Sequence, residues 1–186
     1  MAPPAPWELD VEGVVWADRA WPLALGGMLR YRDSPVGPYA EVWATPAIRL
    51  GHRGPELTIP FMAVDSPASL EGGRANWGLP KTLATFSRAP LAAEGDGWSV
   101  RVLVRSVGLR VPLLAVADLV QRADDGTELR SRARMRGVGR LARVVVDSRT
   151  RWLRSGRHPA VLIEGGSLVV ADPRARPTMP RVPRAS

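Results

Sequence analysis

Proline and glycine interrupt this chain so often that long helices are disfavoured. Eighteen prolines and 18 glycines are spread over 186 residues, and no stretch longer than about a dozen residues keeps a helical period. Proline lacks the backbone donor that a helix interior needs, and glycine lowers helix stability. The sequence therefore predicts a mainly β fold with a few short helices.

Strand signals are short apolar runs bounded by turn-forming residues. Residues 98–105 alternate most cleanly between apolar and polar side chains. Further strands are expected at 41–45, 57–64, 107–114, 159–164 and 167–171. Gly165 and Gly166 separate the last two of these, which predicts a hairpin.

One short helix has clear end signals. Ser66 can act as the N-cap, Pro67 suits the first turn, and Gly72 or Gly73 can end the helix. A second, less regular pattern predicts another helix near residues 114–121.

We expect one domain, residues 1–172, followed by a tail, residues 173–186. A hydrophobic content of 45% is typical of a folded globule. The tail has four arginines, four prolines and no acidic residue, which is typical of a disordered basic segment. The lack of cysteine excludes disulfides and thiolate metal sites, and it suits a reducing compartment. We therefore expect a cytoplasmic protein.

The net charge of +8 raises the question of a nucleic-acid partner. The sequence has no helix-turn-helix, zinc-finger or RNP-type motif, so we disfavour this partner. No membrane partner is expected, because the apolar run at residues 21–29 is too short to span a bilayer. On a strand, the arginines of residues 130–136 would share one face. That face either meets solvent or forms the basic wall of a cavity for an acidic ligand.

Lys81 is the only lysine among 26 basic residues. A guanidinium stays protonated, whereas a deprotonated amine can attack a carbonyl carbon. An ordinary lysine amine is deprotonated at neutral pH in roughly one molecule in a few thousand, and apolar burial increases that fraction. Lys81 is therefore a candidate for imine chemistry, although an arginine-rich composition can also leave one lysine by chance.

Lys81 ends the segment Gly73-Arg-Ala-Asn-Trp-Gly-Leu-Pro-Lys81. This segment resembles the Gly-Arg-Glu…Pro-Lys-Lys motif of the acetoacetate decarboxylase family, with Lys81 at the position of the Schiff-base lysine. Val36-Gly-Pro-Tyr-Ala-Glu41 resembles the family's Tyr-x-Glu segment, whose active-site carboxylate corresponds to Glu41. Val64-Asp-Ser-Pro-Ala-Ser69 resembles the lead-in to the lysine motif. The three blocks follow the family's order.

The resemblance implies an antiparallel, cone-shaped β-barrel that holds Lys81 and Glu41 as catalytic residues. It implies imine formation with a small keto acid or related carbonyl compound, followed by decarboxylation or by aldol and dehydration chemistry. We expect Tyr39, Arg74 and Trp77 to bind substrate, although Tyr39 and Trp77 can also serve as packing residues and Arg74 can pair with a structural acid. A homo-oligomer is implied. We expect no cofactor and, without a metal-ligand pattern, no metal.

The chain departs from the family pattern at several positions. Thr82 replaces a second lysine, Ala75 replaces the glutamate of Gly-Arg-Glu, and Gly26 falls where another active-site glutamate is expected. The family's N-terminal active-site arginine has no clear match. Two interpretations therefore remain beside nucleic-acid binding: a lysine-imine enzyme, and a non-catalytic barrel of the same fold that binds a small ligand.

Overall fold

The structure, a computed structural model, describes residues 2–20, 22–89, 91–123 and 125–176. This part of the chain contains one helix, α1 (Pro67–Trp77), and 13 strands. The strands are β1 (Trp7–Arg19), β2 (Ala24–Asp33), β3 (Tyr39–Thr45), β4 (Ile48–Gly51), β5 (Gly54–Leu57), β6 (Phe61–Val64), β7 (Lys81–Leu83), β8 (Thr85–Arg88), β9 (Leu91–Gly95), β10 (Trp98–Arg122), β11 (Glu128–Ser148), β12 (Gly156–Val170) and β13 (Arg174–Arg176). The predicted mainly β character is confirmed.

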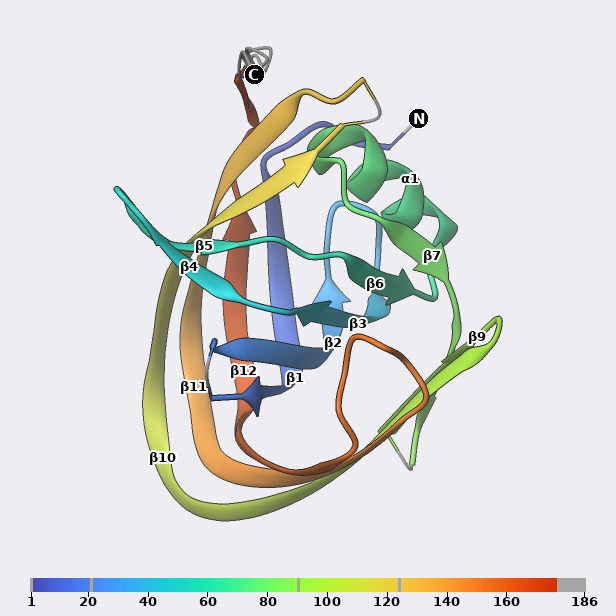
Figure 1. Cartoon of the computed structure of the whole chain (residues 1–186), viewed down its shortest axis with the longest axis vertical. Coiled ribbons are helices and arrows are strands. Elements are labelled where there is room, and N and C mark those ends of the chain that lie inside the picture. Colours follow the sequence, from blue (N-terminus) through green and yellow to red (C-terminus); the bar gives the residue numbers. More distant parts are fainter. Residues whose placement is uncertain (1, 21, 90, 124, 177–186) are drawn as a thin grey trace, which may run out of the picture.

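All the strands belong to one strongly curved sheet (Figure 1). Its main path runs β4-β5-β10-β11-β12-β1-β2-β3-β6-β7, with β8, β9 and β13 paired beside this path. Neighbouring strands are antiparallel except for β5 with β10 and β6 with β7. The path ends at β4 and β7, and no pairing among the described residues joins these ends. The closed barrel that the resemblance implies is therefore not confirmed.

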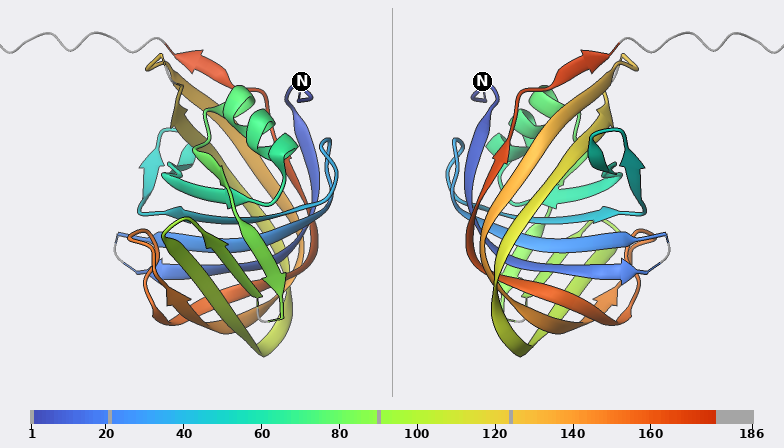
Figure 2. Two further views of the ribbon diagram at one scale, coloured as in Figure 1. Left: turned by 90° about the vertical axis from the view of Figure 1, so that its right-hand side faces the viewer. Right: turned by 90° about the vertical axis from the view of Figure 1, so that its left-hand side faces the viewer.

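The long hairpin of β10 and β11 wraps around one side of the molecule (Figure 2). Its strands have 25 and 21 residues, so it is the longest element of the fold. Residues 114–121 lie within β10, and the helix predicted there is wrong. Each of these residues pairs with one in β11, and this ladder outweighs the local helical pattern.

Other strand predictions are confirmed in part. Residues 41–45 lie in β3 and residues 98–105 in β10, whereas the run 57–64 is broken between β5 and β6, where Pro60 cannot donate to a ladder. The hairpin predicted at Gly165 and Gly166 is wrong, because β12 is continuous there. Gly166 instead allows close approach to β11, because a Cβ there would lie 2.6 Å from a β11 carbonyl oxygen.

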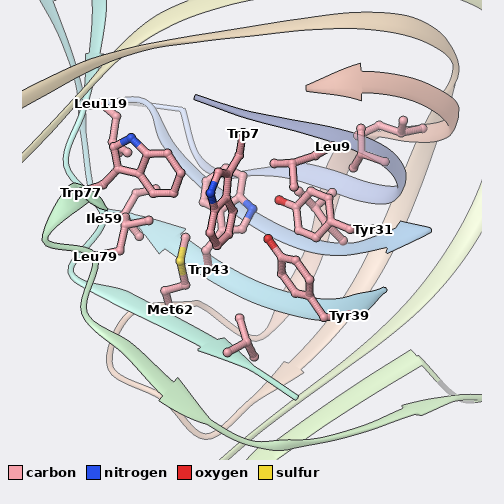
Figure 3. Close-up of a cluster of buried hydrophobic side chains, with 14 residues drawn as sticks. Trp7, Leu9, Tyr31, Tyr39, Trp43, Ile59, Met62, Trp77, Leu79 and Leu119 are labelled. Atoms are coloured by element: carbon pink, nitrogen blue, oxygen red, sulfur yellow. The ribbon is translucent and has the colours of Figure 1, made fainter. Parts of the chain in front are cut away.

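Strands β1, β2 and β3 have buried side chains on both faces. One face packs on what we call the helix-side cluster, drawn in Figure 3. Its members are Trp7, Leu9, Val11, Leu29, Tyr31, Tyr39, Trp43, Ile59, Met62, Val64, Trp77, Leu79, Leu119 and Ile163. The other face packs on the valine-rich cluster. Its members are Val14, Trp16, Met28, Val42, Ala44, Ala63, Ala93, Val100, Val102, Ala142, Val144, Val146, Leu153 and Ala160.

Helix α1 begins as predicted, and Ser66 Oγ accepts a hydrogen bond from the backbone N–H of Ser69 at 3.2 Å. The helix does not end at Gly72 or Gly73. It continues to Trp77 and ends at Gly78, whose φ of 63° is left-handed. Gly72 and Gly73 lie inside the helix and allow close contact with neighbouring side chains.

The sheet extends into the expected tail. Strand β13 pairs with β11, and residues 177–186 lie outside the described residues. Among the described residues, no helix is both long enough and apolar enough to cross a membrane.

Candidate active site

The amine of Lys81 is buried against α1 and β3. Lys81 is the first residue of β7 and pairs with Met62 of β6, which belongs to the helix-side cluster. Its side chain is 3% exposed. Nζ lies 3.0 Å from Oε2 of Glu41 and 2.9 Å from Oγ of Ser69. The fold thus joins an amine and a carboxylate from two of the sequence blocks that carry the resemblance.

Glu41 is equally buried, with its side chain 6% exposed. Its second oxygen, Oε1, accepts a hydrogen bond from the Tyr31 hydroxyl at 3.0 Å. A buried carboxylate persists when it is paired with a cation and hydrogen-bonded. Both conditions hold for Glu41, and its pair with Lys81 carries no net charge.

Two tyrosines flank the pair. Their ring centroids are 4.5 Å apart, and Nζ of Lys81 lies 5.1 Å from the ring centroid of Tyr39. Figure 3 shows both rings at one side of the helix-side cluster. Burial raises the pKa of Tyr31 and Tyr39 well above the usual value, and the nearby Glu41 charge adds to the effect. Both phenols therefore stay neutral around neutral pH. Sequence reasoning missed Tyr31, although it pairs directly with Tyr39 across the β2–β3 hairpin.

Helix α1 shapes the surroundings of the amine. Ser69 is fully buried and accepts the hydrogen bond from Lys81. Gly73 follows one turn later on the same helix face, and a Cβ there would lie 2.5 Å from Cε of Lys81. The helix therefore supplies both an acceptor and the space that the lysine chain occupies. Sequence reasoning quoted Ser69 only as part of a family block and assigned it no role.

Arg74 faces the backbone of the lysine. Its Nε and Nη2 donate to the carbonyl oxygen of Lys81 at 2.9 and 2.6 Å. These contacts hold β7 against α1 and leave the guanidinium directed at a peptide group. Trp77 lies in the helix-side cluster, where its Nε1 donates to the carbonyl oxygen of Ala171 at 3.0 Å and its ring packs edge-on against Trp7.

The positions that depart from the family motif lie away from the buried pair. Thr82 is exposed, because successive residues of a strand point to opposite sides. Its replacement of a lysine therefore removes no charge from the pocket of Lys81. Ala75 is exposed on α1, and Gly26 packs against Trp16 in the valine-rich cluster.

Two cavities lie beside other parts of the sheet, and neither is lined by Lys81 or Glu41. The larger, about 1370 Å³, is an open groove lined by the arginine face of β11 and by β13. Arg130 and Arg132 pair there with Glu56 and Asp118, both at 2.6 Å. The smaller, about 620 Å³, is lined in part by Tyr39. Among the described residues, no three His, Cys, Asp or Glu side chains are grouped as a metal site.

Residues 6–124 match the sequence model of the acetoacetate decarboxylase family. No curated protein sequence matches the chain. Its fold is similar to that of an acetoacetate decarboxylase from Legionella pneumophila, with 12% identity, a TM-score of 0.60 and coverage of 94% of this chain and 88% of that one. The enduracididine biosynthesis enzyme MppR complexed with pyruvate has 14% identity and a TM-score of 0.64, with coverage of 94% of this chain and 91% of that one. An acetoacetate decarboxylase-like enzyme from Sphingomonas wittichii has 11% identity and a TM-score of 0.58, with coverage of 95% of this chain and 94% of that one. Because the family model covers more than half of the sequence, the chain belongs to the acetoacetate decarboxylase family.

Proposed function

We propose that this protein is an enzyme that forms an imine between Lys81 and a small keto acid or related carbonyl compound. Lys81 is the nucleophile, and Glu41 transfers the protons. The observation that carries the proposal is the buried contact of 3.0 Å between Nζ of Lys81 and Oε2 of Glu41. Membership of a family of carbon–carbon lyases supports the same chemistry.

The contact gives a direct route for the first proton transfer. A proton moves from Nζ to Oε2, which leaves a neutral amine and a carboxylic acid. The amine attacks the carbonyl carbon and forms a carbinolamine. Glu41 then returns its proton to the departing hydroxyl, which leaves as water. The products are an iminium ion on Lys81 and a carboxylate on Glu41.

The iminium C=N bond accepts an electron pair from a bond that breaks at the carbon next to the imine carbon. A β-keto acid would lose carbon dioxide at that point. Any substrate with a proton on that carbon would lose it to the Glu41 carboxylate and form an enamine, which is competent for aldol chemistry. MppR is described in complexes with pyruvate and with a condensation product of pyruvate and imidazole 4-carboxaldehyde, which supports the second route for this fold.

A substrate needs a path to the amine. Tyr39 faces Lys81 and also lines the cavity of about 620 Å³, so a movement of its ring would connect the two. The separation of this cavity from Lys81 also favours the second candidate function, a non-catalytic protein that binds a small ligand. Homo-oligomeric assembly and a cytoplasmic location remain proposals.

Trapping with borohydride tests the main proposal. The protein is incubated with a panel of keto acids, ketones and aldehydes, reduced, and mapped by mass spectrometry. Because Lys81 is the only lysine, an adduct on a lysine-containing peptide has one possible origin. We expect a substrate-selective adduct that disappears in Lys81→Arg and in the unfolded chain. A folded protein with no Lys81 adduct across the panel would favour the ligand-binding alternative.

A further inference from the structure

The proposed imine reaction requires a second proton transfer, for which Lys81 and Glu41 alone are poorly arranged. Attack by the neutral amine leaves a positive charge on Nζ and a negative charge on the former carbonyl oxygen. A proton must move from this nitrogen to this oxygen before water can leave. At that stage Glu41 already holds the first proton on Oε2, and its Oε1 accepts a hydrogen bond from Tyr31. The step therefore calls for a group that accepts from the nitrogen and donates to the oxygen.

Ser69 places a hydroxyl next to the amine. It lies in the first turn of α1, is fully buried, and accepts a hydrogen bond from Nζ of Lys81 at 2.9 Å. The N-cap of the helix is made by Ser66, so the start of α1 does not need the Ser69 hydroxyl. A serine hydroxyl has one donor and two acceptor sites, and it can therefore accept from a nitrogen and donate elsewhere at the same time.

The donor side of this hydroxyl is directed at Tyr39. Burial raises the pKa of the Tyr39 phenol, and a hydrogen bond from Ser69 acts in the opposite direction. The Tyr39 ring centroid lies 5.1 Å from Nζ of Lys81, so the phenol, the hydroxyl and the amine are close together. A carbonyl oxygen that reaches Nζ can therefore replace the phenol as the acceptor of the Ser69 proton.

We propose that Ser69 is a catalytic residue of this site and carries the second proton from the nitrogen to the oxygen of the adduct. The inference rests on the proposed imine chemistry. Oγ takes a proton from Nζ while the Ser69 hydroxyl gives its own proton to the oxygen. One N–H bond breaks, one O–H bond forms, and Ser69 ends as it began.

The relay suits a buried site because it leaves the net charge of the site unchanged. The adduct oxygen is bonded to the same carbon as Nζ, so a hydroxyl at 2.9 Å from Nζ lies beside both atoms. The transfer cancels the positive and negative charges of the adduct and gives a neutral carbinolamine. Glu41 still holds the first proton and delivers it to the departing hydroxyl, which leaves as water. Two groups thus divide the proton transfers, and neither has to give and take protons in alternation.

Ser69→Ala tests the relay through the rate of imine formation. The protein is mixed with a keto acid, pyruvate, or an aldehyde, propanal, and quenched with borohydride after increasing times. The Lys81 adduct is then measured by mass spectrometry. A catalytic group changes the rate of approach to equilibrium and leaves the equilibrium itself unchanged. We therefore expect the rate to fall at least tenfold in Ser69→Ala, while the final trapped fraction stays within twofold of the wild type.

Ser66→Ala is the matched control, because it loosens the same turn of α1 and leaves the Ser69 hydroxyl in place. Its rate should stay within twofold of the wild type. If Ser69→Ala does not fold, Ser69→Cys decides, because a thiol is a weak donor and acceptor and should show the same fall in rate.

Three other results are decisive. An unchanged rate in folded Ser69→Ala would overturn the inference and leave the imine proposal intact. Equal losses of rate and of final trapped fraction would also overturn it, because Ser69 would then only hold the amine in place. The absence of a Lys81 adduct in the wild type with either probe would refute the imine proposal and the relay together.

Discussion

The two buried clusters differ in chemistry although the same strands build both. The valine-rich cluster contains mostly aliphatic side chains, six of them valines, together with Trp16. The helix-side cluster adjoins a connected set of buried polar groups, made by Lys81, Glu41, Ser69 and Tyr31. One face of β1, β2 and β3 therefore packs on apolar side chains, and the other adjoins the buried polar groups to which we assign the proposed chemistry.

This difference has an energetic meaning. Burial of apolar surface contributes about 25 cal/mol per Å² and needs no partner. A buried ion pair is stabilised by its attraction but loses the hydration of both ions, so its net contribution is close to zero or unfavourable. Under the proposed function the Lys81–Glu41 pair serves the chemistry, and the apolar valine-rich cluster contributes stability.

The largest stability effect is expected from breaking the pair. In Glu41→Leu the buried Lys81 loses its carboxylate partner, and such a change costs about 3–5 kcal/mol of unfolding free energy. Denaturant unfolding monitored by tryptophan fluorescence measures the loss. A cost below about 1 kcal/mol would show that Lys81 reaches water in the variant and that the pair is less buried than its exposure of 3% and 6% indicates.

A truncation in the valine-rich cluster should separate stability from chemistry. Leu153 is 4% exposed there, and Leu153→Ala is expected to cost about 2–5 kcal/mol. Borohydride trapping of Lys81 below the unfolding transition should be unchanged, because this side chain lies on the opposite face of the sheet. A matching loss of trapping would mean that the two clusters act as one unit.

The double variant Lys81→Met with Glu41→Leu tests whether the cost of Glu41→Leu comes from the unpaired charge of Lys81. Both charges are removed, so no unpaired ion remains, and we expect an unfolding free energy within about 1–2 kcal/mol of the wild type or above it. Compared with Glu41→Leu alone, it recovers most of the lost stability while it abolishes imine formation. A double variant as unstable as the single one would show that the pair stabilises the fold directly.

The sequence predicted that Lys81 and Glu41 share one site, and it did not predict the residues that surround them. Lys81 and Glu41 were found because both lie in motifs, and the fold brings them together as expected. Tyr31 was missed because its role follows from its register opposite Tyr39, which a linear motif does not contain. Substrate binding by Arg74 stays a prediction. Its hydrogen bonds to the Lys81 carbonyl oxygen were not foreseen, because the direction of a long side chain depends on tertiary contacts.

Some fold predictions failed at glycine, because glycine can either end a regular element or permit close packing inside one. Glycine was interpreted as a turn or helix end at residues 72–73 and 165–166, yet each pair lies inside a regular element. At Gly72, Gly73 and Gly166 the absence of a side chain allows a neighbouring residue to come close, which is a property of the packed fold. Likewise, residues 114–121 form a strand because β11 pairs with them, and the order of the sheet cannot be read from that segment alone.

Of these variants, Gly73→Ala is expected to change the unfolding free energy least and still to affect the site of Lys81. In Gly73→Ala the new methyl group meets Cε and Cδ of Lys81 at 2.5 and 2.6 Å. These atoms belong to a flexible chain that can move aside, and alanine favours the helix by about 1 kcal/mol over glycine, so the net change in unfolding free energy should stay within about 1 kcal/mol. The amine, however, must leave Glu41 and Ser69, and we expect the trapped Lys81 adduct to fall at least tenfold. Ser66→Ala is the matched control, because it weakens the N-cap of α1 by about 1 kcal/mol, and the Ser66 hydroxyl bonds to the backbone of Ser69 at the other end of the helix from Gly73. If both variants lowered trapping equally, the effect would come from the stability of α1, and the space at Gly73 would have no specific part in holding the amine.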